Sequence, residues 1–412
     1  MRFNMLPLCA RSKARQASTP RTLAARYPGV DERDAYTSPV YTLDLMSVRT
    51  NNRLLSAARC VLENVGCFHL YRASAAAASG VAKSACALSI AIWMLATVTA
   101  GEAFPAALAT TTDALHPFSS GTHKVLVDQR VSGVRRSYYV HVPAGYGGSA
   151  PLPVVVALHG AFSTARQLER DSGLSLLADR EGFLVVYPQG IGLGDWFRHW
   201  NSGYCCGKAR RINLDDVGFA LAAVDDVARR NPVDRSRLYV AGFSNGGMLA
   251  YRIAAEHPEI VAAVAVVSGT IGGVPSPNEP EWSIGRPKRP VAVLAMHGLA
   301  DANIPFKGGR GSQSHGDSSA ISVARSLRFW IDADHCGVDP QVESLAQGHV
   351  ELQSWSGCSD DTQVLLYSLN NWGHQWPKEK LLGGFDAAGT IWRFFERHRI
   401  VRMPSDDGVD NH

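Results

Sequence analysis

The residues Gly242-Phe243-Ser244-Asn245-Gly246 fit the pattern G-x-S-x-G, in which a serine at a tight turn can act as a nucleophile. Residues 237–241 before the pattern are typical of a strand, and residues 246–256 after it are typical of a helix. A serine at such a turn has a strained backbone, so the flanking glycines remove side chains that would collide. The start of the helix also favours negative charge. We therefore predict that Ser244 is a nucleophile.

A nucleophilic serine needs a histidine base and an acid that orients it. In proteins with this turn, the acid and then the histidine follow the serine along the chain. Asp301 follows an expected strand at 291–296, and His374 follows an expected strand at 363–369. We predict that His374 is the general base and that Asp301 holds its imidazole.

Other histidines and acids compete for these roles. His159 and His297 each end a strand but precede the acid, so we expect them to form structural hydrogen bonds. Asp332 and Asp334 follow a helix and are expected to be surface carboxylates.

Catalysis by serine also requires N–H donors for the oxyanion of the tetrahedral intermediate. The first donor is expected to be the backbone N–H of Asn245, the residue after the nucleophile. The second is expected in the loop after the strand at 153–158, where we favour Ala161 and keep Gly160 or Phe162 as alternatives.

Strands alternate with helices along this part of the chain, which predicts the α/β class and a doubly wound, mostly parallel sheet with helices on both faces. Together with the serine turn, this pattern predicts the α/β-hydrolase fold, formed by one catalytic domain at 104–412. The expected strands are 136–142, 153–158, 183–187, 237–241, 262–267, 291–296 and 363–369. The expected helices are 167–179, 214–228 with Asn213 as its N-cap, 246–256, 321–330 and 387–397, and 270–288 is expected to be an inserted loop.

The first hundred residues differ in charge from the rest. Residues 1–103 contain 12 Lys and Arg against 6 Asp and Glu, which leaves 29 basic and 31 acidic residues for the remainder. A nucleic-acid partner would require a basic stripe on the folded part, and none is evident. We therefore expect no nucleic-acid partner.

Residues 81–103 have the features of a secretory signal peptide: Lys83, an uncharged run at 85–98 and then small residues. The run is short for a membrane span, although an uncleaved anchor or a buried helix remains an alternative. Residues 1–80 show no sustained period, so we expect them to be unstructured or not translated, with the true start near Val81; a transit peptide is the other interpretation. After cleavage we expect a secreted or periplasmic protein with no stable membrane association.

Cysteine usage agrees with export. The four cysteines of the catalytic part form an even set, as disulfides do in an oxidising compartment: Cys205, Cys206, Cys336 and Cys358. A bridge between Cys336 and Cys358 would contribute about 3 kcal/mol in the chain-entropy account. Cys205 and Cys206 could form a vicinal bridge, whereas the spacings do not fit a zinc site.

Several segments, taken together and in order, resemble the poly(3-hydroxybutyrate) depolymerase and feruloyl/acetylxylan esterase group of secreted hydrolases. They are residues 158–160, 200–207, 215–219, 242–248, 297–301 and 373–377. The resemblance spans residues 125–400 and implies carboxylic ester hydrolysis through an acyl-enzyme, without a metal or an organic cofactor. It also implies that Trp200, Asp216 and Trp376 shape the substrate pocket, although Asp216 could instead anchor its helix and Trp200 could pack in a loop.

The expected substrates are hydroxyalkanoate (hydroxybutyrate) oligomers or feruloyl- and acetyl-type esters. A serine peptidase or an acyltransferase on the same fold is the alternative, because a fold does not fix chemistry. A binding protein without activity would have no reason to retain Ser244, Asp301 and His374 at strand ends.

Overall fold

The computed structural model describes residues 116–131, 134–193 and 196–401, all within one compact unit, Ala109–His412. The expected signal peptide at 81–103 and the residues before it lie outside these ranges. Within the described ranges, no helix is both long enough and apolar enough to cross a bilayer.

A sheet of 10 strands forms the centre of the described unit, in the order β1-β2-β4-β3-β7-β8-β11-β15-β14-β13. Its neighbours from β4 to β15 run parallel. These strands are β3 Leu152–Leu158, β4 Leu184–Pro188, β7 Val233–Phe243, β8 Ala263–Val267, β11 Ala292–Gly298 and β15 Val364–Leu369. The predicted doubly wound, mostly parallel sheet is therefore confirmed, and the seven expected strands correspond to β2 and these six.

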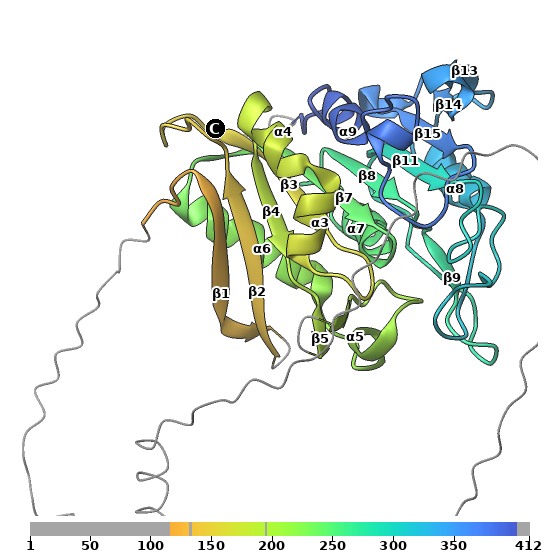
Figure 1. Cartoon of the computed structure of the whole chain (residues 1–412), viewed down its shortest axis with the longest axis horizontal. Helices are drawn as coiled ribbons and strands as arrows, with labels where there is room; N and C mark the ends of the chain where they lie inside the picture. The colour runs from red at the N-terminus through yellow and green to blue at the C-terminus, as the bar shows by residue number, and fades with distance from the viewer. Residues whose placement is uncertain (1–115, 132–133, 194–195, 402–412) are drawn as a thin grey trace, which may run out of the picture. The chain divides into compact units, whose positions relative to one another are not determined.

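The central strands are apolar on both faces because helices cover both. On β3, Val154, Val156 and Leu158 pack into one core cluster, while Val155 and Ala157 pack into the other. The first cluster contains residues of α6 Asp216–Arg230, α7 Asn245–Glu256 and α8 Val323–Ala333. The second contains residues of α3 Ala165–Ser172, α4 Leu174–Glu181 and α9 Ala387–Phe395. Figure 1 shows α3 and α4 lying over β3 and β4.

Antiparallel strands extend the sheet at both edges. At one edge β1 Gly121–Val131 pairs with β2 Val134–Val142, which pairs with β4. At the other edge β14 Val350–Trp355 pairs with β15, and β13 Gln341–Leu345 pairs with β14. The strands β1, β13 and β14 were not predicted from the sequence. In β13, residues 341–344 are exposed, so the strand lacks the apolar pattern that reveals a buried one.

Two helix predictions are wrong in detail. Residues 167–179 were expected to form one helix, but the chain breaks at Gly173, whose φ of 69° ends α3 before α4 begins. Asn213 was expected to cap the next helix, but α6 begins at Asp216 and Asp215 is its N-cap, accepting from the Gly218 N–H at 2.7 Å. Asn213 has a φ of 46°, so it lies in a turn before the cap.

The prediction of a plain loop at 270–288 is also wrong. It contains β9 Gly272–Val274 and β10 Trp282–Ser283, which form a small sheet with β12 Ser319–Ala320. The remaining elements are β5 Ile191–Leu193, β6 Trp196–His199, α5 Gly207–Arg211 and the 3-10 turns Ala346–Gly348, Ser359–Asp361 and Glu379–Leu381.

Two disulfides lie in the described unit. Cys336, just after α8, is bonded to Cys358, which follows β14. Cys205 is bonded to its neighbour Cys206, the N-cap residue of α5. Both pairings agree with those inferred from the four cysteines of the sequence.

Candidate active site

Ser244 lies on the sharp turn between β7 and α7, with φ 54° and ψ −121°. The turn is held by hydrogen bonds from the Ser244 N–H to the Val267 carbonyl at 2.8 Å and from the Met248 N–H to the Ser244 carbonyl at 2.9 Å. A Cβ atom at Gly246 would overlap the Leu158 carbonyl, so β3 passes too close for any side chain there. The local sequence therefore forms the predicted strand–serine–helix turn at the carboxyl edge of the sheet.

The three predicted triad residues meet at this edge. The Nε2 atom of His374 lies 2.8 Å from the Oγ atom of Ser244. The Nδ1 atom of His374 lies 2.8 Å from the Oδ2 atom of Asp301. Both histidine nitrogens are thus engaged, one with the hydroxyl and one with the carboxylate.

The carboxylate of Asp301 is fully buried but well supplied with donors. Its Oδ1 atom accepts from the N–H groups of Asn303 at 2.9 Å and Ile304 at 2.8 Å. Burial acts to raise the pKa of Asp301, but the hydrogen bonds from His374 and the Ile304 N–H outweigh burial and lower it. Asp301 is therefore ionised when it contacts the imidazole.

His297 supports the acid loop, as expected of a structural histidine. Its Nε2 atom lies 2.8 Å from the Ile304 carbonyl, to which it donates, and 3.5 Å from the Oδ2 atom of Asp301. Burial lowers the pKa of His297. The imidazole therefore holds the Ile304 turn next to the acid.

The loops that carry the acid and the base are joined through their backbones. The Ala300 N–H donates to the Trp372 carbonyl at 3.0 Å, and the Leu299 N–H donates to the Leu369 carbonyl at 3.0 Å. A Cβ atom at Gly298 would overlap the Trp372 carbonyl, so only glycine permits this crossing. The relative position of Asp301 and His374 is consequently set by main chain rather than by long side chains.

Such a Ser–His–Asp arrangement can perform acyl transfer. The imidazole can take the Ser244 proton as Oγ attacks a carbonyl carbon and can later donate it to the leaving group. An ionised acid on Nδ1 fixes the tautomer that leaves Nε2 free to accept the proton.

Asn245, the expected first oxyanion donor, is held by its side chain. Its Oδ1 atom accepts from the Trp200 N–H at 2.7 Å, and its Nδ2 group donates to the Ser202 hydroxyl at 3.0 Å. In the loop after β3, the Phe162 N–H donates to the Arg198 carbonyl at 2.7 Å and is therefore occupied. Ala161 and Asn245 both line the cavity that contains Ser244 and His374, called the catalytic cavity below.

A buried ion pair that was not predicted from the sequence anchors the loop after β6, which contains Trp200 and Asn201. The Nη2 group of Arg136 on β2 donates to the Oδ1 atom of Asp216 at 2.6 Å, and both side chains are almost fully buried. The Oδ2 atom of Asp216 accepts from the Asn201 N–H at 2.7 Å. The signal in the sequence was an arginine in period-two register with Tyr138, which is buried on the same strand.

His159 is a further structural histidine, next to the loop that contains Trp200. Its Nδ1–H donates to the Gly160 carbonyl at 2.8 Å, and its Nε2 atom accepts from the Gly190 N–H at 3.0 Å. The Trp200 indole N–H donates to the His159 carbonyl at 2.8 Å. Burial lowers the pKa of His159 to about 4, so the ring is neutral and keeps both bonds.

The catalytic cavity has a volume of about 160 Å³. Its lining includes Ser244 and His374, with Phe162, Cys205, Cys206, Met248, Asn303, Ile304, Ser314, His315 and Ser318 among the other residues. Three residues expected in the pocket, Trp200, Asp216 and Trp376, do not line this cavity. Trp200 is buried in the loop after β6, Asp216 is buried at the start of α6, and Trp376 packs edge-on against Phe243, with ring centroids 6.5 Å apart.

Among the described residues, no group of three or more His, Cys, Asp or Glu side chains is arranged to hold a metal ion.

The sheet order, the two helical layers and the serine turn at the carboxyl edge define an α/β-hydrolase. A sequence profile of the Esterase PHB depolymerase family matches residues 136–279. A protein named as an esterase, NocK of Nocardia uniformis subsp. tsuyamanensis, is 33% identical over 266 residues, which cover 60% of this chain and 72% of NocK. The chain therefore belongs to this esterase family and is a carboxylic ester hydrolase.

Other similarities are more distant. Feruloyl esterase B of Piromyces equi is 24% identical over 240 residues, which cover 58% of this chain and 42% of that protein. This chain thus spans less than half of the length of that relative. The solved acetyl xylan esterase from Aspergillus awamori is 17% identical, with a TM-score of 0.47, and the alignment covers 66% of this chain and 99% of that structure.

Proposed function

We propose that this protein is an exported serine esterase that hydrolyses hydroxyalkanoate oligomers or feruloyl- and acetyl-type esters through an acyl-enzyme on Ser244. The observation that carries the proposal is the continuous chain of contacts from the Ser244 hydroxyl through His374 to Asp301, with 2.8 Å at each step. An ester suits this site because the serine can attack the acyl carbon and His374 can protonate the departing alcohol. The Asn245 and Ala161 N–H groups are the proposed oxyanion donors.

The size of the cavity bears on the acyl group. At about 160 Å³, it is smaller than the roughly 300–1,000 Å³ typical of pockets that enclose a drug-sized ligand. An acetyl or hydroxybutyryl group would fit such a space, whereas a feruloyl group would extend out of it. We therefore propose that short acyl groups are preferred.

Aromatic side chains beside the cavity are proposed to contact the rest of the substrate. Phe162 lines the cavity and is 48% exposed, and Phe197, which is 58% exposed, packs edge-on against it with ring centroids 5.8 Å apart. His315 also lines the cavity and lies 5.1 Å from the Phe162 ring. These rings offer an apolar surface for the alcohol portion of the ester or for the next unit of an oligomer.

A substrate panel tests this function. We expect hydrolysis of p-nitrophenyl acetate, p-nitrophenyl butyrate and hydroxybutyrate trimer, with a lower kcat/KM for methyl ferulate. An alanine p-nitroanilide should not be hydrolysed. Faster turnover of the anilide than of any ester would favour the peptidase alternative, and no turnover of any ester would overturn the proposal.

Export is supported by the disulfides, because such bonds persist in oxidising compartments. Sequencing the N-terminus of the native protein tests it. We expect the mature chain to begin after Ala100 or Ala103, where small residues precede the cleavage site. A native protein that retains residues 1–80 would contradict export by this signal.

A further inference from the structure

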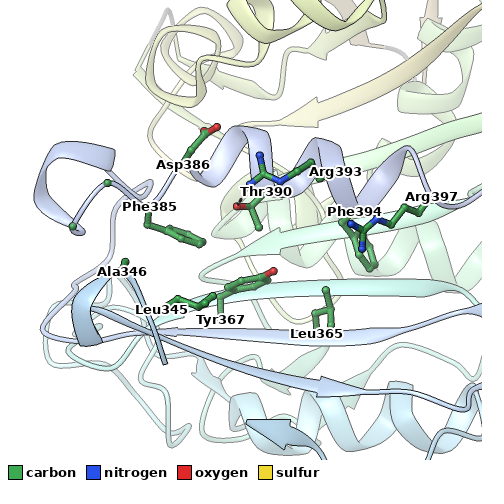
Figure 2. Close-up of a pocket in the computed structure, with 12 residues that line it drawn as sticks. Leu345, Ala346, Leu365, Tyr367, Phe385, Asp386, Thr390, Arg393, Phe394 and Arg397 are labelled. Atoms are coloured by element: carbon green, nitrogen blue, oxygen red, sulfur yellow. Dashed lines mark hydrogen bonds between the residues drawn. The ribbon is translucent and has the colours of Figure 1, made fainter. Parts of the chain in front are cut away.

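A second cavity, of about 380 Å³, lies between α9 and the strands β13 and β15 and shares no residue with the catalytic cavity. Its volume falls within the range of about 300–1,000 Å³ that is typical of small-molecule sites. Much of its lining is apolar, with Leu345 and Leu365 from the strands, Phe385 from the loop before α9 and Phe394 from α9 itself. Figure 2 shows these side chains around the space.

Two arginines line the same cavity from the end of α9. Arg393 lies in the last turn of the helix, and Arg397 follows its C-cap residue, Glu396. The Nη2 group of Arg393 donates to the Thr390 hydroxyl at 3.0 Å. Neither guanidinium has a carboxylate oxygen within 4.0 Å among the described residues. The negative end of the helix dipole favours these cations. Most N–H donors of the two guanidinium groups nevertheless remain available to a ligand.

The acidic residue in the lining is already engaged. The carboxylate of Asp386 caps α9, where its Oδ1 atom accepts from the Gly389 N–H at 2.9 Å. One oxygen of Asp386 is therefore committed to the start of the helix. The Arg393 guanidinium reaches back along α9, where its Nη1 atom would lie 3.0 Å from a Cβ added at Gly389.

Tyr367 adds a third donor to the cavity. Its ring packs against Phe385 with centroids 5.5 Å apart, and within the described chain its hydroxyl has no hydrogen-bond partner. Burial raises the pKa of Tyr367, while the positive charges of Arg393 and Arg397 act to lower it, as expected if both guanidiniums lie near the hydroxyl. Figure 2 shows the Tyr367 oxygen directed toward the α9 wall that carries Thr390 and Arg393.

We propose that this cavity binds an amphiphilic carboxylate, that is, an aryl or alkyl acid with one anionic group. The apolar body lies among Leu345, Leu365, Phe385 and Phe394, and the carboxylate accepts from Tyr367, Arg393 and Arg397. Guanidinium groups match carboxylate geometry, and hydrogen bonds to ionised groups are stronger than those between neutral ones. Inorganic phosphate would satisfy the donors but would leave the apolar walls uncovered.

Acids of this class are what ester hydrolysis releases, so the site could report product concentration at a distance from Ser244. This link rests on the proposed function, but binding itself does not, because the cavity contains no triad residue. The binding test is therefore made on the full chain with Ser244→Ala, which cannot turn over an ester contaminant through Ser244.

The probe is 3-phenylpropionate, followed by isothermal titration and ligand-detected NMR, with its methyl ester and inorganic phosphate as comparisons. We expect saturable binding of the acid in the millimolar range or tighter and no saturation by the methyl ester or by phosphate. The double variant Arg393→Met/Arg397→Met should weaken binding at least about 10-fold, because two charge-assisted contacts are lost. Tyr367→Phe should weaken it several-fold.

Arg328→Met is the matched control, since Arg328 is an exposed arginine on α8 that pairs with Asp332. It should bind the acid as the parent does. Equal binding of acid and methyl ester, or full binding by the double variant with an unchanged melting temperature, would overturn the proposal. In the wild-type background, the same double variant should keep its kcat on p-nitrophenyl acetate. If the wild type itself hydrolyses no ester, that result counts against the proposed function and not against the binding proposal.

Discussion

The Nε2 atom of His374 lies 2.8 Å from the Oγ atom of Ser244, although 130 residues separate them in the chain. The strands that precede them, β7 and β15, are not neighbours, because β8 and β11 lie between them in the sheet. The contact is therefore made above the carboxyl edge, by loops whose backbones are tied to one another. Small changes in that backbone are expected to affect catalysis as strongly as changes in the triad itself.

Asp301→Asn is expected to lower kcat by about 10⁴-fold with little change in KM. The amide oxygen can still accept from the Asn303 and Ile304 N–H groups, so the loop should keep its shape. The amide no longer provides the charge that stabilises an imidazolium, and it can present an N–H to Nδ1 instead. Steady-state kinetics on p-nitrophenyl butyrate, with a thermal melt to check folding, measure this. A variant that keeps more than about a tenth of the wild-type kcat would exclude Asp301 as the orienting acid.

Gly246→Ala is expected to destabilise the protein and to abolish most activity. The added Cβ would overlap the Leu158 carbonyl, so α7 would have to move away from β3 and take Ser244 with it. The matched control is Gly285→Ala, because a Cβ there meets nothing within 4 Å. Thermal unfolding and esterase assays of both variants should separate them clearly. Equal melting temperatures and activities of the two variants would show that neither stability nor activity depends on the close approach of β3 and α7.

The Arg136–Asp216 pair is expected to act as a unit. Arg136→Met leaves the buried Asp216 carboxylate without its partner and should cost about 3–5 kcal/mol of unfolding free energy. The double variant Arg136→Met/Asp216→Asn should lose much less than the sum of the two single variants, because no unpaired charge stays buried. Urea unfolding of all four proteins measures this coupling. Additive losses would mean that the two residues do not depend on each other.

His159 is expected to make the fold sensitive to acid. Its pKa is lowered to about 4 in the fold from 6.5, so protonation favours the unfolded chain. The neutral ring therefore stabilises the fold fully above pH 6.5, and this contribution is lost as the pH falls toward 4, by up to about 3 kcal/mol. In His159→Gln, the difference in unfolding free energy between pH 7 and acid should be smaller than in wild type. An identical pH dependence would contradict a neutral, buried His159.

The central sheet and the contacts of Ser244 were predictable because they depend on strong local signals. Continuous apolar runs identify strands buried on both faces, and glycines on each side of a serine identify the turn. Asp301 and His374 could then be selected because residues that follow parallel strands meet at one edge of the sheet. The edge strand β13 was missed because most of its side chains are exposed and its pattern is polar.

The supporting contacts were not predictable from single motifs. Arg136 and Asp216 lie 80 residues apart, on β2 and at the start of α6, and they meet only because α6 packs against β2 and β4 in the fold. The break at Gly173 was missed because an isolated glycine within a helical pattern is often tolerated. Trp200 and Trp376 were expected at the pocket, but both are buried in packing roles that depend on loops without regular periodicity.

Covalent labelling shows directly whether Ser244 is the nucleophile. A p-nitrophenyl alkylphosphonate should release one equivalent of p-nitrophenol and add one phosphonyl group to the peptide that contains Ser244, as read by mass spectrometry. Ser244→Ala should show no adduct and should lose about 10⁵–10⁶-fold in kcat, while Ser268→Ala, a buried serine after β8, should still be labelled. A phosphonyl group on another residue, or full esterase activity in Ser244→Ala, would show that Ser244 is not the nucleophile.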